Sequence, residues 1–173
     1  MSSRNTLRPL QCSLLAALAL TTSSAFANPN VAAGTPNQSF ELPAGYACAN
    51  FPLKVETWDG KGEYREVKSR NGYTRFAFAG TGAAWRLTNL GSGKSMTTQN
   101  NGASALIQIN EVDGSVKYKI QGHSLLIWFP TDMPKGPSTT LNSGQVSFHV
   151  DAIGTGSMLS TEGKTTDVCA TLK

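Results

Sequence analysis

The chain has few of the residues from which catalytic and metal sites are usually built. Its 173 residues include only 2 histidines and 3 cysteines, and charged residues make up 15% of the sequence. No run of Lys and Arg alternates with aromatic residues, as is common in nucleic-acid binders, so no nucleic-acid partner is expected. This composition leaves enzymatic activity open, favours a non-catalytic protein and predicts no cofactor.

Long apolar runs are also scarce, and the one present lies near the start of the chain. The run from Leu14 to Leu20 follows Arg4 and Arg8 and precedes Ala25-Phe26-Ala27. A basic start, an apolar core and a small-x-small ending are typical of a secretory signal peptide, here over residues 1–27. No later segment reaches the length of a membrane span, so we expect a secreted, extracellular protein without a transmembrane anchor.

The remaining chain is predicted to form one domain with one disulfide. Residues 28–43 are rich in small and polar residues and predict a flexible leader. Residues 44–173 have the length of a single domain. Cys12 lies in the signal segment, which leaves Cys48 and Cys169 to pair in an oxidising compartment. The alternative is two unpaired, buried thiols.

No segment after residue 27 shows the apolar period and caps of a helix. Short alternating runs separated by turn residues instead predict an all-β fold, an antiparallel β-sandwich of about ten short strands. The run Ser124–Phe129 is apolar on both faces and predicts a central strand covered on both sides. The dipeptides expected in tight hairpins are Asp59-Gly60, Asn71-Gly72, Asn101-Gly102 and Asp113-Gly114. The predicted strands are Leu53–Trp58, Glu63–Lys68, Tyr73–Ala79, Ala84–Asn89, Lys94–Thr98, Ala103–Asn110, Ser115–Gln121, Ser124–Phe129, Gln145–Asp151 and Gly156–Thr161, with a closing piece near Val168–Leu172.

Three aromatic residues lie in or beside a stretch in which basic residues outnumber acidic ones. Trp58, Tyr64 and Tyr73 fall between Lys54 and Lys94. Flat, exposed rings stack on sugar faces, so these three side chains are candidates for a carbohydrate platform. The alternative is ordinary core packing, which we expect for the other two tryptophans.

Two further groups of residues could carry chemistry. His149 and Asp151 occupy alternate positions of a predicted strand and would share a face. If His123 came close, the three would form a two-histidine, one-carboxylate metal site, although structural hydrogen bonding is the plainer explanation of each. Asp132 lies in the proline-rich loop Phe129–Ser138, where it would either contribute to binding or cap the turn through its carboxylate.

Several short motifs resemble those of a family of small secreted proteins found mostly in actinobacteria. The most specific is the loop that reads Pro130-Thr131-Asp132, then Pro134 and Gly136-Pro137. The others are Pro43-Ala44-Gly45 with Cys48 and Phe51-Pro52-Leu53, Thr88-Asn89-Leu90 with Gly93-Lys94-Ser95, Gly122-His123, and Asp167-Val168-Cys169-Ala170. That family is uncharacterised, so the resemblance implies secretion and a compact domain but assigns no catalytic residue.

The sequence therefore predicts a secreted, monomeric, non-catalytic interaction module that binds a cell-wall polysaccharide or the surface of a host or neighbouring cell. One alternative is an effector-like or structural protein with a protein partner. Another is a small metal-dependent hydrolase that uses His123, His149 and Asp151.

Overall fold

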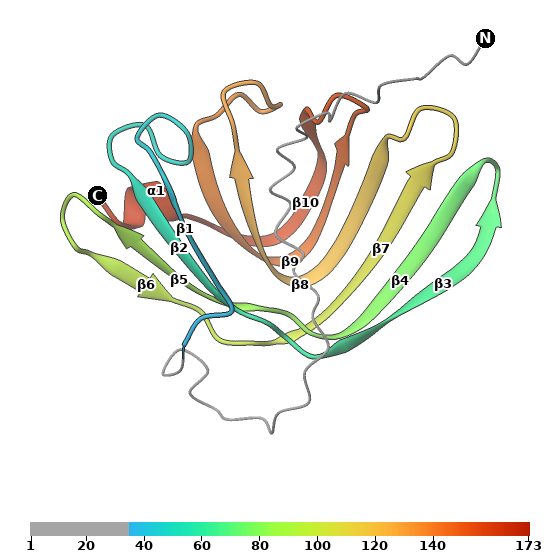
Figure 1. Cartoon of the computed structure of the whole chain (residues 1–173), viewed down its shortest axis with the longest axis horizontal. Helices are drawn as coiled ribbons and strands as arrows, with labels where there is room; N and C mark the ends of the chain where they lie inside the picture. The colour runs from blue at the N-terminus through green and yellow to red at the C-terminus, as the bar shows by residue number, and fades with distance from the viewer. Residues whose placement is uncertain (1–34) are drawn as a thin grey trace, which may run out of the picture.

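The computed structural model describes residues 35–173, apart from the side chain of Arg70. This part of the chain is built from two antiparallel sheets, with strand orders β1-β2-β5-β6 and β10-β9-β8-β7-β4-β3 (Figure 1). The predicted all-β fold with two packed sheets is confirmed. The elements are β1 (Gln38–Leu42), β2 (Leu53–Trp58), β3 (Gly62–Arg70), β4 (Tyr73–Thr81), β5 (Ala84–Asn89), β6 (Ser95–Thr97), β7 (Gly102–Asn110), β8 (Val116–Trp128), β9 (Ser138–Val150), β10 (Gly156–Asp167) and the short helix α1 (Val168–Thr171).

The two sheets are connected by a three-stranded ribbon that crosses from one to the other. β2 pairs with β5 and β3 pairs with β4 in the same register, on either side of a short interruption. The β5–β6 and β4–β7 pairs likewise share one register. β8, β9 and β10 belong only to the six-stranded sheet and bend away from this ribbon as U-shaped strands (Figure 1). The six-stranded sheet therefore consists of one half of the ribbon, β3, β4 and β7, and of the three bent strands that follow it.

A row of glycines marks the bend of β8, β9 and β10. Gly122 pairs with Gly144, which pairs with Gly163, and their φ angles are 112°, 139° and 101°. A Cβ atom on Gly144 would overlap the backbone carbonyl of Glu162. Only glycine allows both this backbone conformation and this close approach of neighbouring strands. The glycine row thus lets the sheet fold over itself.

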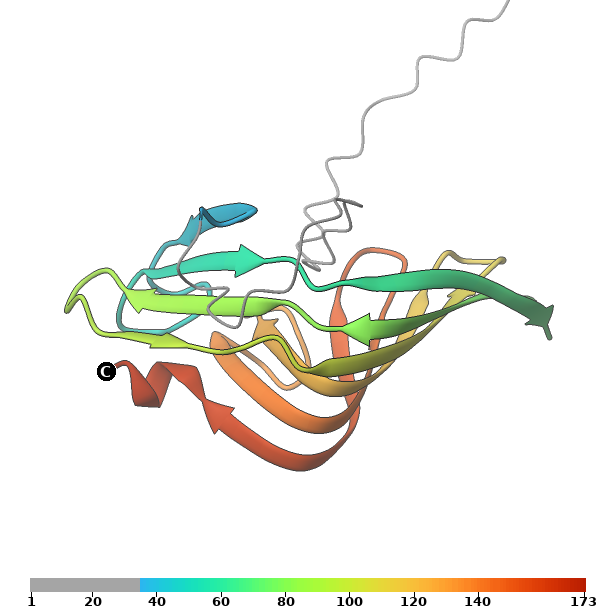
Figure 2. The same ribbon diagram turned by 90° about the horizontal axis from the view of Figure 1, so that it is seen from below.

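The bend creates two separate cores. The first lies between the four-stranded sheet, α1 and one face of β8 and β9 beyond the bend, and includes Leu53, Leu87 and Val168. The second lies inside the bend, where Trp128 meets Phe148 edge-on with ring centroids 6.3 Å apart. β8 contributes alternate residues to the two cores, so the predicted central strand is covered on both sides. Figure 2, turned by 90°, shows the curvature of β8–β10 and places α1 beside the four-stranded sheet.

The Cys48–Cys169 disulfide is present and joins α1 to the loop before β2, with 5.5 Å between the Cα atoms. The closing piece predicted as extended is instead the helix α1, because the Asp167 carboxylate caps it by accepting a hydrogen bond from the backbone N–H of Ala170. The pairing of the two cysteines is thus confirmed, and only the local conformation at Cys169 differs from the prediction.

The predicted leader is also partly wrong. Residues 38–42 form β1, which pairs with β2 along its length. Phe40 and Leu42 lie at alternate positions on one face of β1 and pack in the first core. Their burial stabilises this strand even though the segment as a whole contains few apolar residues. The predicted signal peptide lies outside the described residues. Within the described residues, no helix is long and apolar enough to span a membrane.

Two of the four predicted turn dipeptides close hairpins, and two do not. Asn71-Gly72 joins β3 to β4 with positive φ at both residues, and Gly114 has a positive φ in the turn between β7 and β8. Asp59-Gly60 instead lies at the interruption of the ribbon between β2 and β3, and Asn101-Gly102 lies where β7 begins after the interruption that follows β6. The hairpin glycines provide a positive φ, whereas at Gly60 a Cβ atom would overlap the backbone carbonyl of Thr81.

Candidate functional site

A cleft lies where β8 leaves the ribbon. β8 pairs with β7 as far as Gln121, and His123, Ser124 and Leu125 are among the first residues beyond that point. The cleft holds a cavity of about 140 Å³. The six-stranded sheet contributes two groups of residues to its walls: Tyr64, Phe78, Ala105 and Ile120 before the bend of β8, and His123, Ser124 and Leu125 after it. The four-stranded sheet contributes Thr57 and Trp85.

Aromatic side chains form the apolar walls of this cavity. Tyr64 and Phe78 are directly opposite each other on β3 and β4, with ring centroids 4.9 Å apart. Burial in these apolar surroundings raises the pKa of the Tyr64 phenol. Trp85 of β5 lines the cavity from the other sheet. The cleft therefore offers ring surfaces from both sheets to one small volume.

Two buried hydroxyl groups in the lining have no hydrogen-bond partner. Thr57 and Ser124 are only 3% and 5% exposed, and neither Thr57 Oγ1 nor Ser124 Oγ is hydrogen-bonded. A buried hydroxyl left unpaired costs about 1–3 kcal/mol relative to one that is satisfied. Each oxygen is covered by neighbouring atoms, so a polar molecule in the cavity, either water or a ligand, reaches it only if the lining shifts.

His123 adds a polar group at the edge of the cleft. The amide nitrogen of Asn101 lies 3.0 Å from His123 Nδ1, so the imidazole is held by the segment that leads into β7. His123 is thus the one member of the predicted metal set that lines the cavity. Its ring can exchange hydrogen bonds with a hydroxyl-bearing ligand, since an imidazole nitrogen accepts or donates according to its protonation.

The structure does not assemble the predicted metal site. His149 pairs with Lys117 on β8. Lys117 precedes His123 by six residues, which is about 20 Å along the strand, so the two histidines lie far apart. Asp151 caps the β9–β10 turn, where its Oδ1 accepts hydrogen bonds from the backbone N–H groups of Ile153 and Thr155. No group of three His, Cys, Asp or Glu side chains suited to a metal ion occurs within residues 35–173.

The predicted aromatic platform is not assembled either. Trp58 is only 4% exposed, and the Arg86 guanidinium lies 5.2 Å from its ring centroid. Tyr64 lines the cleft, whereas Tyr73 lies on the opposite face of the sheet, with the Lys117 ammonium 5.8 Å from its ring. The alternation of side chains along β3 and β4 separates the two tyrosines, because Tyr64 shares the face of Phe78 and Tyr73 does not.

Asp132 holds its loop in place. The carboxylate is 6% exposed; Oδ2 accepts a hydrogen bond from the backbone N–H of Phe129, and Oδ1 accepts one from that of Gly156. Both oxygens are therefore committed to the backbone, one within the proline-rich loop and one at the start of β10. Of the two roles considered from sequence, this geometry matches the turn cap.

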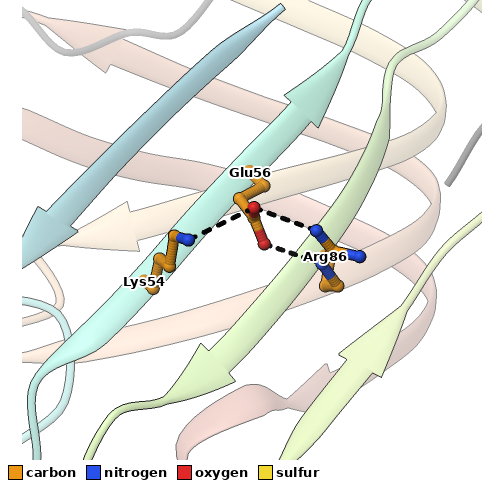
Figure 3. Close-up of polar contacts among 3 residues, drawn as sticks. All are labelled: Lys54, Glu56 and Arg86. Atoms are coloured by element: carbon orange, nitrogen blue, oxygen red, sulfur yellow. Dashed lines mark hydrogen bonds and ion pairs between the residues drawn. The ribbon is translucent and has the colours of Figure 1, made fainter. Parts of the chain in front are cut away.

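A second buried carboxylate, Glu56, lies on the face of β2 that points away from the first core. Arg86 binds it through two hydrogen bonds, Nε to Oε2 at 2.7 Å and Nη2 to Oε1 at 2.9 Å (Figure 3). The Lys54 ammonium lies 3.3 Å from Oε1. The hydrogen bonds from Arg86, and to a lesser extent those from Lys54, lower the pKa of Glu56. This group connects β2 to β5 electrostatically.

The Glu56 group predicts a specific pH dependence of stability. Because its pKa is lower in the folded state, its contribution is complete above pH 4.5, the ordinary pKa of a glutamate, and is lost as the pH falls through the folded-state pKa. We therefore expect Glu56→Gln to lower the denaturation midpoint at pH 7, and the difference from wild type to shrink below pH 4.5. Urea unfolding at a series of pH values measures this.

The matched control for that experiment is Glu63→Gln. Glu63 and Arg65 form a pair of nearly equal length, 3.0 Å, but both side chains are largely exposed. An exposed pair contributes little to stability, so this variant is expected to unfold like wild type throughout the series. Equal effects of the two substitutions would show that the burial and two-point geometry of Glu56 have no consequence.

The two orphan hydroxyls were not identified from the sequence, although a partial signal was present. Thr57 continues the inward-facing positions of Leu53 and Val55, so it is a polar residue at a core position. Ser124 precedes the apolar run of β8 in the same way. Neither pattern shows that the two side chains line one cavity, because their strands are brought together only by the bend.

Comparison of this chain with protein-family models, with curated proteins and with solved structures finds no match in any of the three. The function is therefore inferred from the cleft itself.

Proposed function

We propose that this protein is an extracellular, non-catalytic binding module that holds one sugar ring of a polysaccharide in the cleft between its two sheets. The observation that carries the proposal is the pair of unpaired, buried hydroxyls, Thr57 Oγ1 and Ser124 Oγ, in a cavity walled by aromatic rings. A sugar presents apolar C–H faces and a polar hydroxyl edge, and this lining offers a partner for each.

The size of the cavity supports a single ring as the bound unit. A dry cavity of about 150 Å³ in another protein accommodates benzene, whereas drug-sized ligands occupy pockets of about 300–1,000 Å³. At about 140 Å³, this cavity is close to the size that accommodates one six-membered ring. We therefore infer that it anchors one unit of a longer chain, whose remaining units lie outside it.

Export is part of the proposal. The N-terminal pattern of basic, apolar and small residues is typical of a signal peptide, and the Cys48–Cys169 bridge is of the kind that persists in oxidising compartments. The resemblance to small secreted proteins points the same way. A cell-wall polysaccharide is the ligand class that combines this location with the chemistry of the cleft.

Removing the orphan hydroxyls is expected to have opposite effects on stability and on binding. Thr57→Val and Ser124→Ala each delete a hydroxyl that has no partner in the free protein, so each should stabilise that protein, by about 1 kcal/mol. Each should also weaken polysaccharide binding by at least about tenfold, since a hydrogen bond to the ligand is lost. Thermal unfolding and pull-down with insoluble cellulose, chitin, peptidoglycan and whole cell walls measure the two effects.

Tyr46→Ala is the control, because Tyr46 is an exposed aromatic residue that belongs neither to the cleft nor to the six-stranded sheet. This variant should bind polysaccharide as wild type does, whereas Tyr64→Ala should not. Loss of stability in Thr57→Val and Ser124→Ala would mean that the hydroxyls hold structural water. Failure of the wild-type protein to bind any of the four polymers would overturn the proposal and favour a protein partner.

A further inference from the structure

The face of the six-stranded sheet opposite the cleft carries unpaired positive charge. Register partners on adjacent strands form rows that run across the sheet. One such row contains Arg75 on β4, Gln108 on β7, Lys117 on β8 and His149 on β9. Lys119 is on the neighbouring row, which continues across the sheet to Arg65. We name this surface the convex basic face, defined by Arg65, Tyr73, Arg75, Lys117, Lys119 and His149.

The central cations of this face are not neutralised by the protein. Arg65 pairs with Glu63, but among the described residues no ion pair involves Arg75, Lys117 or Lys119. Arg75 Nε is buried and has no hydrogen-bond partner. That nitrogen is covered by neighbouring atoms, so the exposed ammonium groups of Lys117 and Lys119 are the cations that an external anion can reach.

The acidic groups near this face lie at its margins. Glu63 and Glu162 are on the row nearest the bend, two residues beyond Arg65 and Lys119. Asp113 lies in the β7–β8 turn, close enough to His149 for the imidazole to help lower the Asp113 pKa, although hydrogen bonds from Ser115 are the main cause. The centre of the face therefore presents positive charge without an opposing carboxylate.

We propose that the convex basic face binds a linear anionic polysaccharide, at a site separate from the cleft. Arg75 on β4 and Lys117 on β8 are separated by one intervening strand, which places their backbones about 10 Å apart. Lys117 lies over the Tyr73 ring, which restricts the position of its ammonium. Cations set at strand spacing along one row match a chain that carries repeated carboxylate or sulfate groups across the strands.

An anionic membrane is the alternative ligand, and the structure favours it less. Membrane binding combines positive charge with apolar side chains that enter the lipid. The nearly fully exposed apolar side chains at this end of the sheet, Val112 and Ile153, are at the tips of turns beside Glu111, Asp113 and Asp151. These carboxylates would be repelled by anionic headgroups.

The test compares dextran sulfate with dextran, which share a backbone and differ in charge. We expect the full-length protein to bind dextran sulfate and not dextran, with an affinity that falls as salt is added. The triple variant Arg75→Gln/Lys117→Gln/Lys119→Gln should bind roughly tenfold more weakly or worse, with a shallower salt dependence. Polygalacturonate, tested in parallel, distinguishes carboxylate from sulfate recognition.

The matched control is Lys94→Gln/Lys135→Gln/Lys164→Gln, which removes the same charge from exposed residues outside the convex basic face. This variant should retain wild-type affinity for dextran sulfate. An equal loss of affinity in the control variant would show that only the net charge of the protein matters, and would overturn the proposal. Failure of the wild-type protein to bind either anionic polymer would overturn it as well. If the protein binds phosphatidylglycerol vesicles and dextran sulfate does not displace it from them, the proposal is overturned and a membrane is the favoured ligand. Near-UV circular dichroism of both triple variants verifies that they are folded.

Discussion

Replacing both Cys48 and Cys169 by alanine is expected to lower the free energy of unfolding by up to about 5 kcal/mol. The bridge connects residues 121 apart in sequence, so its removal frees almost the whole described chain in the unfolded state. Domains of this kind are stable by only about 5–15 kcal/mol, so the loss is a large fraction of the total. Guanidinium unfolding of the oxidised wild type and of the double variant measures it.

The effect should be concentrated at the C-terminal helix. Val168 in the helix is fully buried in the first core, Leu172 at its C-cap is nearly so, and the helix has only four residues. Hydrogen exchange is therefore expected to rise first in α1 and in the loop that contains Ala47 and Cys48. Reduced wild-type protein is the control and should match the double variant. A loss below about 1 kcal/mol would mean that the packing of α1 holds the ends together without the bridge.

The second large effect is expected at the centre of the glycine row. Gly144→Ala places a Cβ against the Glu162 carbonyl and a side chain on a backbone with φ of 139°. We expect a loss of about 4 kcal/mol, since neither strand can move without disturbing the pairing on both sides. The bend also brings Trp128 to Phe148, so the second core should loosen with it. Urea unfolding and tryptophan fluorescence measure the two consequences.

Gly114→Ala separates the two causes. Gly114 has a φ of 74° in the β7–β8 turn, and a Cβ there would meet nothing within 4 Å. This variant should lose only the cost of a left-handed alanine, about 1–2 kcal/mol. If Gly144→Ala costs no more than Gly114→Ala, the close approach of β9 to β10 is not what the glycine row provides.

Local patterns were enough to predict most strands. Leu53–Trp58 and Ala84–Asn89 form strands with the predicted bounds, because alternation and turn residues specify them within a few positions. The central position of Ser124–Phe129 was also readable, since a strand that is apolar on both faces must be covered on both. The disulfide followed from the number of cysteines and the expected compartment, without any knowledge of the fold.

That β8 continues as one strand through the bend could not be predicted from local patterns. The sequence predicted separate strands at 115–121 and 124–129, whereas β8 is one strand of 13 residues. Gly122 is a breaker when read locally, yet it continues the strand because Gly144 and Gly163 stand beside it. Whether a glycine ends a strand or bends it depends on which residues pair with it, and these lie far away in sequence.

The sequence by itself determined the all-β class, the positions of most strands and the cysteine pair, since each depends on short-range periodicity or on composition. Only the tertiary structure decided the site. Tyr64 and Tyr73 were grouped by their nearness in sequence, but the pairing of β3 with β4 puts them on opposite faces. Thr57 and Ser124 share a cavity because β8 leaves the ribbon beside β2 and β5. Such proximity is a property of non-local strand pairing, which no local pattern in the chain encodes.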